Sequence, residues 1–167
     1  MKKVLACLIL LASFFSGICF SEEAEVSAYD RIEMSFMKEE IVNLFGEGVR
    51  EGEYEIFSGE VMCAFYESGR LMAKGLVYEA VCDIAPVADI PLESLKKLKQ
   101  GAMISEITEL FGCEGIEIMR INLSDEENAG VRLVLAWQNA EKITVQALFE
   151  LDDGEWVLFA VAESPAQ

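Results

Sequence analysis

The chain has 167 residues and a formal net charge of −17, from 13 basic and 30 acidic side chains. That length suits one ordinary domain or two very small ones, and the acidic charge argues against binding to nucleic acid or to anionic lipid headgroups. Because the sequence holds no histidine, it excludes Ser-His-Asp and Cys-His catalysis, histidine metal sites and histidine pH switches.

Residues 1–21 are predicted to be a secretory signal peptide. Lys2 and Lys3 precede the apolar run Val4–Phe15, and small residues follow before the expected cut after Ser21. A basic start, an apolar core and a small-residue exit are the marks of such a leader. A retained membrane anchor is the rival interpretation, although the apolar run is short for a span. The chain is therefore expected to be exported, to the periplasm or cell envelope.

Cys19 offers an alternative as the lipidated first residue of a lipoprotein. Ser16 and Gly17 fit the general character of a lipoprotein signal, but Ile18 stands where a small residue normally precedes the cysteine. Contact with a membrane is expected only through such a lipid anchor at Cys19.

The first half of the mature chain, residues 22–84, is predicted to be an α+β unit. An acidic helix over Glu22–Glu33 packs through Val26, Tyr29 and Ile32, and a second helix ends at Gly46. Glu47–Glu53 is expected to be a polar loop. Segments rich in Val, Ile, Phe and Tyr then predict strands separated by Ser58-Gly59-Glu60 and Glu67–Arg70 turns: Tyr54–Phe57, Val61–Tyr66 and a long strand Leu71–Asp83, with an interruption at Gly75.

The second half is predicted to repeat this plan over residues 92–163, after a linker at 85–91 and before a tail at 164–167. The linker contains Pro86 and Pro91, which favour extended chain. Leu92–Gln100 is expected to be a helix whose lysines form the only concentrated basic patch. A helix ending at Gly112 follows, and then four strands: one within Glu114–Asn122, Val131–Trp137, Lys142–Leu151 and Glu155–Ala162.

The two helices before the strands echo each other. Phe36–Gly46 and Ala102–Gly112 lie 66 residues apart, and six of their eleven positions are identical. In each copy Ile, Leu and Phe at i, i+3 and i+4 predict one apolar stripe (Ile41, Leu44 and Phe45; Ile107, Leu110 and Phe111). Two helical turns are unstable alone, so each stripe is expected to pack against a sheet. The echo favours a duplicated module over chance.

A helix bearing G-M-T-x-x-E-V-x-x-L-L-G, followed by a four-stranded antiparallel sheet, is the pattern of the β-lactamase inhibitory protein-like fold. The sequence resembles that family twice, over Ser35–Gly46 and Gly101–Gly112, and Leu135–Trp156 resembles the family's closing strands. The family includes the small lipoprotein of the outer-membrane β-barrel assembly machinery. Two departures are Met37 and Met103, which replace the usual capping Thr or Ser.

The resemblance implies a fold of two tandem helix-helix plus antiparallel-sheet repeats, whose sheets form one aromatic-bearing surface. It implies a non-catalytic exported envelope protein that binds another protein and needs no cofactor or metal. Large aromatics make good interface anchors, and the candidates for partner contact are Tyr54, Phe57, Tyr66, Trp137 and Trp156. For any single aromatic, packing in the core is the better expectation, because strand alternation sends half of them to either face.

Inhibition of a β-lactamase is an alternative that the resemblance implies. In the family's inhibitor, a hairpin of the first repeat enters the active site of the enzyme. The matching hairpin here is Ser58-Gly59-Glu60, in which Glu60 is the candidate contact. Nothing else in these residues indicates inhibition.

A second class of fold stays open, a single NTF2-like cone that binds a small molecule or acts as an enzyme. Its closing strands resemble Ala147–Glu163, and it predicts an apolar pocket with Glu150 or Asp152 as a carboxylate base. The cone leaves the echoed helices unexplained.

The acidic loops and the cysteines predict no metal site. Asp152–Glu155 is expected to be an Asp-Gly hairpin turn rather than a calcium loop, and Asp125–Glu127 lacks calcium-loop spacing. Cys63, Cys82 and Cys113 are expected to be free thiols, with one disulfide as the alternative.

Overall fold

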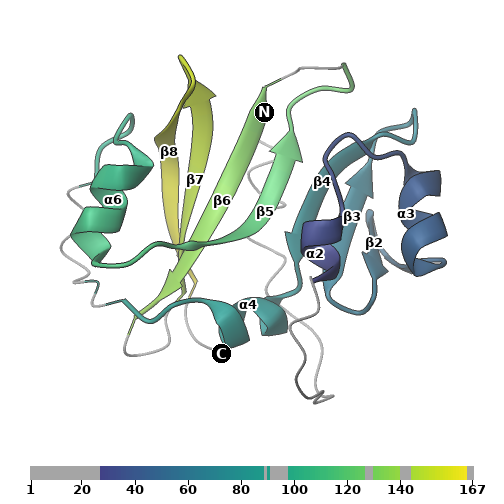
Figure 1. Cartoon of the computed structure of the whole chain (residues 1–167), viewed down its shortest axis with the longest axis horizontal. Coiled ribbons are helices and arrows are strands. Elements are labelled where there is room, and N and C mark those ends of the chain that lie inside the picture. Colours follow the sequence, from purple (N-terminus) through teal and green to yellow (C-terminus); the bar gives the residue numbers. More distant parts are fainter. Residues whose placement is uncertain (1–26, 89, 91–97, 127–129, 140–143, 165–167) are drawn as a thin grey trace.

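The computed structural model describes residues 27–88, 90, 98–126, 130–139 and 144–164. The predicted signal peptide, Cys19 and the lysine-rich part of Leu92–Gln100 lie outside these residues. The chain folds as an open antiparallel sheet of eight strands in sequence order, with short helices before and beside it (Figure 1). The strands are β1 (Val49–Glu51), β2 (Tyr54–Phe57), β3 (Val61–Phe65), β4 (Leu71–Leu76), β5 (Ile116–Asn122), β6 (Val131–Gln138), β7 (Thr144–Asp152) and β8 (Glu155–Ser164).

The echoed segments form the two longest helices among the described residues. At the start of each helix, a glutamate side chain accepts a backbone hydrogen bond. Helix α3 spans Lys38–Phe45 and helix α6 spans Ile104–Phe111. Glu40 accepts the N–H of Met37 and Glu106 accepts the N–H of Met103, each at 2.8 Å. This is the glutamate half of a capping box, so each helix start keeps one side-chain bond without a Thr or Ser. Gly46 and Gly112, with φ of 80° and 74°, end the helices.

Two shorter helices frame the junction between the halves. Helix α2 (Ala28–Arg31) begins after Ser27, whose hydroxyl oxygen accepts the N–H of Asp30. Tyr29 and Ile32 are buried as predicted. Helix α4 (Tyr78–Ile84) follows β4, where a long strand to Asp83 was predicted. That prediction is wrong because Val81 and Ala85, one turn apart, are both buried, and this helical spacing prevails over the β-branched composition.

Helices α3 and α6 cover the same face of the sheet. One row of paired residues runs across it from Cys63 through Lys74, Arg120 and Leu133 to Phe149. Cross-strand partners share a face. Cys63 packs in the core cluster that contains Ile41 of α3, and Phe149 packs in the cluster that contains Ile107 of α6. Neither α3 nor α6 covers the opposite face, which we call the helix-free face for that reason. Its residues Val134 and Leu148 pack in the core cluster that also contains Val81 of α4.

Only part of each predicted apolar stripe is buried. Ile41 and Ile107 have no exposed surface, whereas Leu44 and Leu110 are 44% and 42% exposed. The expectation that both leucines pack against the sheet is therefore wrong, although the two helices repeat each other in burial as well as in sequence.

Pairing of β4 with β5 joins the two halves into one sheet, and the predicted linker is held against it. Ala85, Ala88 and Ile90 are buried. Ala88 donates its N–H to the carbonyl of Gln138 at 2.7 Å, and Gln138 donates to the carbonyl of Pro86 at 2.8 Å. The described residues of the predicted linker, 85–88 and 90, are therefore held against the end of β6. The predicted loop Glu47–Glu53 also contains a strand, β1, and all three of its residues are exposed.

The two halves match each other at irregular positions. The β3–β4 pair carries a bulge at which Phe65 pairs with Leu71 and Ala64 with Ala73. The β7–β8 pair carries the same bulge, at which Phe149 pairs with Leu158 and Leu148 with Ala160. Each half thus has one extra residue, Met72 or Phe159, at the same place. Bulges are specific features of a strand pair rather than defects.

Candidate functional site

The helix-free face carries an apolar row that crosses the whole sheet. Every link of the row is a register pair: Val49, Ile56, Met62, Gly75, Met119, Val134, Leu148 and Ala160. None of the eight residues is polar. Val49 is 66% exposed, Ile56, Met62, Met119 and Ala160 are half-buried, and Val134 and Leu148 are buried. The Met119 side chain reaches over Gly75, where an added Cβ would lie 3.0 Å from its methyl group.

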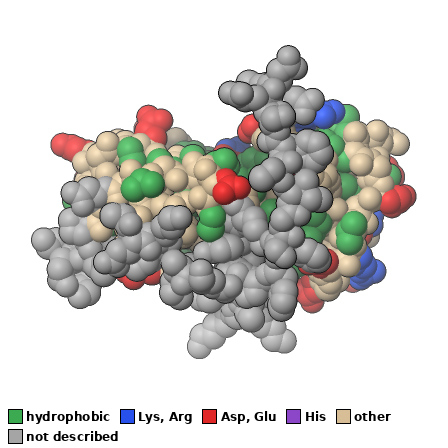
Figure 2. Space-filling view, turned by 90° about the horizontal axis from the view of Figure 1, so that it is seen from below, with side chains coloured by type: hydrophobic (Ala, Val, Ile, Leu, Met, Phe, Trp, Pro, Cys, Tyr) green, Lys and Arg blue, Asp and Glu red, His purple; other side chains and the backbone are tan. Residues whose placement is uncertain are grey.

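Charged side chains border this face. Arg132 Nη2 lies 3.2 Å from Glu150 Oε2, and the guanidinium stacks 4.1 Å from the ring centre of Phe159. Arg132 Nε is buried, and no hydrogen bond reaches it from the described residues. In the view of Figure 2, acidic side chains lie at both ends of the molecule, and Lys and Arg side chains show mainly on the half that carries α3. The row is thus bordered by the Arg132–Glu150 ion pair.

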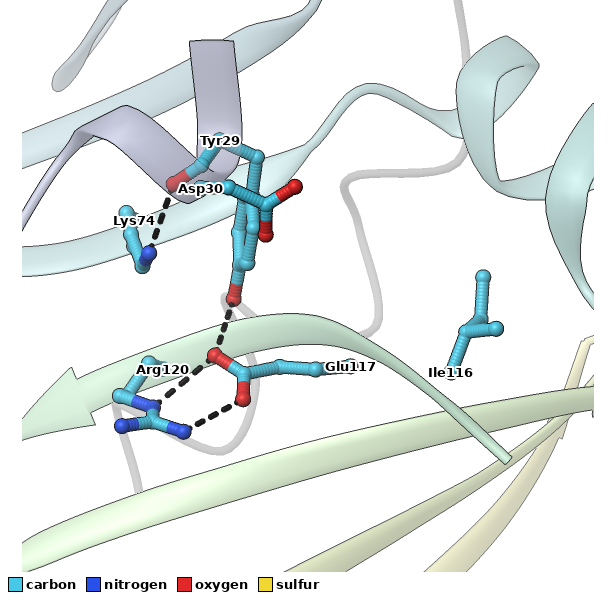
Figure 3. Close-up of a pocket in the computed structure, with 6 residues that line it drawn as sticks. All are labelled: Tyr29, Asp30, Lys74, Ile116, Glu117 and Arg120. Atoms are coloured by element: carbon cyan, nitrogen blue, oxygen red, sulfur yellow. Dashed lines mark hydrogen bonds and ion pairs between the residues drawn. The ribbon is translucent and has the colours of Figure 1, made fainter. Parts of the chain in front are cut away.

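A polar cluster occupies the other face, at the seam between β4 and β5 (Figure 3). Tyr29 donates its hydroxyl to Glu117 Oε1 at 2.8 Å, and Arg120 donates to both oxygens of the same carboxylate. Lys74 lies opposite Arg120 in the ladder and donates to the carbonyls of Tyr29 and Ile32 at 2.7 and 2.8 Å. With Asp30 and Ile116, these residues line a hollow of about 390 Å³.

The electrostatics of the seam cluster favour a structural role. Burial raises the pKa of the Tyr29 hydroxyl above its ordinary range, and the Glu117 carboxylate beside it raises that pKa further. Burial lowers the pKa of Lys74. The Glu117 carboxylate is already bound by Arg120 and Tyr29, so it offers no free base. The cluster ties α2 to strands of both halves, and it lacks the apolar lining that the cone alternative predicts.

Phe57 and Trp137 belong to the core and not to a partner surface. Phe57 is 1% exposed and Trp137 has no exposed surface. The Trp137 indole donates to the carbonyl of Cys113 at 3.1 Å and meets Phe111 edge to face. The expectation that these two aromatics bind a partner is wrong, because both lie on the helix-covered face and fill the space beneath α3 and α6.

Each of these rings packs so closely against a glycine that a larger residue would overlap it, and sequence analysis missed both glycines. A Cβ added to Gly48 would lie 2.9 Å from Cζ of Phe57, and one added to Gly115 would lie 2.5 Å from Cε2 of Trp137. The signal available in the sequence was a second glycine shortly after each helix-ending glycine.

The other predicted contacts are held within the fold. Trp156 packs beside the core cluster under α6, and Tyr66 donates its hydroxyl to the carbonyl of Asn122 at 2.8 Å. Glu60 accepts the N–H of Ala28 at 2.9 Å and its carbonyl accepts the N–H of Val77. Tyr54 is half-buried on β2. These four residues lie on different strands and turns.

The remaining candidates for chemistry have structural roles. Asp153 and Gly154 have φ of 48° and 87° and form the β7–β8 hairpin turn as predicted. Cys63, Cys82 and Cys113 are free thiols, of which Cys63 is buried. Over the described ranges, no cluster of acidic and cysteine side chains is arranged to hold a metal ion. No helix within those ranges has the length and apolar character needed to cross a membrane.

No family model and no curated protein matches this chain.

Proposed function

We propose that the mature chain is an exported, non-catalytic protein-binding module, and that its partner docks on the helix-free face. The observation that carries this proposal is the apolar row from Val49 to Ala160, in which eight paired residues on eight strands include no polar side chain. A sheet whose one face is covered by helices normally has polar residues on the face that stays in water. Five of the eight (Val49, Ile56, Met62, Met119 and Ala160) keep some solvent-exposed surface, and apolar surface that stays accessible marks an interaction site.

The chemistry of the row fits a protein partner. Met62 and Met119 lie near its middle and are half-buried, and methionine is a flexible apolar side chain that adapts to varied contact surfaces. Sequence analysis expected aromatic anchors on this surface. Methionine and aliphatic residues take their place, because the register turns Phe57 and Trp137 to the face covered by the helices.

The same proposal takes the fold as two fused β-lactamase inhibitory protein-like repeats. Three matched features support a duplication: the capping glutamates of α3 and α6, the equivalent bulges in β3–β4 and β7–β8, and the glycines beneath Phe57 and Trp137. Independent irregularities that coincide are better explained by copying than by chance. Export through residues 1–21, to the periplasm or envelope, belongs to this proposal, with a lipid at Cys19 as its alternative.

Site-specific photocross-linking in the exporting cell tests the docking face. A photoreactive amino acid is placed at Met62 or Met119, and at Leu110 as a matched control. Leu110 is an exposed apolar residue on α6, and therefore on the opposite side of the sheet. We expect one protein to be cross-linked from both methionine positions and not from Leu110. We also expect this cross-link from Met119 to be lost when Met62→Asp is introduced, but to persist with Leu110→Asp.

Two results would contradict the proposal. One is the same set of cross-linked proteins from all three positions, and the other is no cross-linked protein from Met62 and Met119 in a folded, exported chain. Inhibition of a β-lactamase by the purified protein is assayed in parallel. Glu60 is held by Ala28 in the fold, so an inhibitor would contact the enzyme through the hairpin tip Ser58-Gly59.

A further inference from the structure

Strand β8 repeats strand β4, including the bond that each makes to the start of a helix. Leu71 donates its N–H to the carbonyl of Phe36 at 3.1 Å, and Leu158 donates to the carbonyl of Ala102 at 2.7 Å. Phe36 and Ala102 are equivalent positions of the echoed segments. The isolated bridges that follow, Met37 with Arg70 and Met103 with Val157, are equivalent too.

The next residues of β4 accept a neighbouring strand. Ala73, Lys74 and Gly75 pair with β5 in antiparallel register. Through the shared bulge, the equivalent residues of β8 are Ala160, Val161 and Ala162. Among the described residues, β8 is the last strand of the sheet, and no strand pairs with this part of its outer edge.

Backbone direction at the β8 edge follows from the same equivalence. Val77 donates its N–H to the carbonyl of Glu60, the residue just before β3, so alternation along the strand directs the N–H and C=O of Leu76 and Lys74 toward the β5 side. Their equivalents in β8 are Glu163 and Val161. These two residues therefore present hydrogen-bonding groups to the outside of the sheet.

The two edges of the sheet differ in how well they could accept a strand. The β1 edge is three residues long and carries two charged residues, Arg50 and Glu51. Short length and charge are two ways in which natural edge strands avoid pairing. β1 is the equivalent of β5 in the first half, but it ends in the turn at Gly52. It therefore lacks the positions through which β5 pairs with β4. The β8 edge is a ten-residue strand, in which Glu163 is the only charged residue after the hairpin position Glu155.

We propose that the β8 edge binds an extended basic segment of a partner protein as an antiparallel ninth strand, paired to Val161 and Glu163. Main-chain hydrogen bonds then supply affinity, and side chains alternate between the two faces. Charge selects the occupant: the chain carries −17 and Glu163 is exposed on the edge itself, so a basic segment is attracted and a second copy is repelled. The inference rests on the proposed function, because the added strand would extend the apolar row beyond Ala160.

A tethered strand provides the test. A peptide in which valine alternates with lysine and threonine is fused after Gln167 through a flexible glycine-serine linker, which gives an effective concentration on the order of millimolar. Amide hydrogen exchange is then followed by NMR. We expect the amides of Val161 and Glu163 to exchange at least about ten-fold more slowly than in the untethered chain, while the amides of β1 stay unchanged.

Matched variants separate strand pairing from other effects. We expect a tether with glutamate in place of lysine to lose the protection, and Glu163→Lys to weaken it. Glu155→Lys, the same charge change at the far end of β8, should have little effect. Val161→Pro removes an outward N–H and should abolish the protection.

The proposal is overturned by unprotected Val161 and Glu163 amides in the lysine tether, or by equal protection in the glutamate tether. Sedimentation showing that the untethered chain dimerises, with the dimer lost in Val161→Pro, would also overturn it in favour of a second copy. Cross-linking from Met62 and Met119 does not depend on this edge. If those cross-links persist while the edge fails to bind, only the ninth strand is rejected and the proposed function stands.

Discussion

The half that contains α3 and the half that contains α6 share one framework. They differ in their edge strands and in the aromatic ring that packs beneath each helix. Each half places a buried isoleucine, an aromatic ring and a close-packed glycine in the same arrangement. The first half ends its outer strand after three residues, and its β4 edge is joined to the second half through a polar cluster. The second half has longer strands, and among the described residues β8 is the edge of the sheet. The comparison shows that the shared residues support each helix, whereas the residues that differ decide what each edge pairs with.

Removing the buried isoleucine of each helix tests whether the two frameworks are equivalent. We expect Ile41→Ala and Ile107→Ala each to lower the free energy of unfolding by about 3 kcal/mol, because each leaves a cavity between a helix and the sheet. Leu44→Ala and Leu110→Ala, at the exposed positions one turn later, should each cost less than about 1 kcal/mol. Urea unfolding followed by circular dichroism measures all four. A large cost for only one isoleucine would break the comparison.

Substitutions at Gly48 and Gly115 test how the two halves differ in the aromatic ring that packs against each glycine. We expect Gly115→Ala to destabilise the fold by about 2–3 kcal/mol, because the new methyl group overlaps the buried Trp137 ring, which a hydrogen bond fixes to Cys113. Gly48→Ala should cost less, since its contact with Phe57 is longer and the ring carries no polar anchor. The same unfolding assay applies. Equal costs, or a stabilising Gly115→Ala, would show that Trp137 moves freely.

Cys63 is a buried position at which the two halves differ, and the pH dependence of the free energy of unfolding tests that difference. Its equivalent in the second half is Ala147, so Cys63→Ala makes the two halves alike at a buried position. Burial raises the pKa of the Cys63 thiol to about 12, above an ordinary value of 9.0. A raised pKa means that ionisation favours the unfolded chain, so the wild type loses stability as pH rises from 9.0 toward 12.

The free energies of unfolding of wild type and Cys63→Ala should therefore converge above pH 9.0. Thiol labelling of the native protein at mildly alkaline pH gives the control: Cys82 and Cys113 are partly exposed and should react, while Cys63 should react only after unfolding. A constant stability difference across this range, or native-state labelling of Cys63, would contradict the expectation.

Much of the local structure could be predicted from the sequence. The ends of α3 and α6, the strand Tyr54–Phe57 and the Asp153-Gly154 turn appear where the periodicity and the turn residues place them. The α+β class followed from these elements. The candidate surface could not be predicted in the same way, because the face that a strand residue occupies depends on register and on bulges, and a shift of one residue reverses it.

The sequence by itself determined the helices, the turns and the likeness of the two halves, since those signals depend on neighbours a few residues away. Only the tertiary structure decided that Phe57 and Trp137 lie in the core, that methionines lie on the opposite face, and that Tyr78–Ile84 is helical. It also decided that β4 pairs with β5 and leaves β8 as an edge. Those outcomes depend on contacts between residues far apart in the chain, which local propensity does not specify.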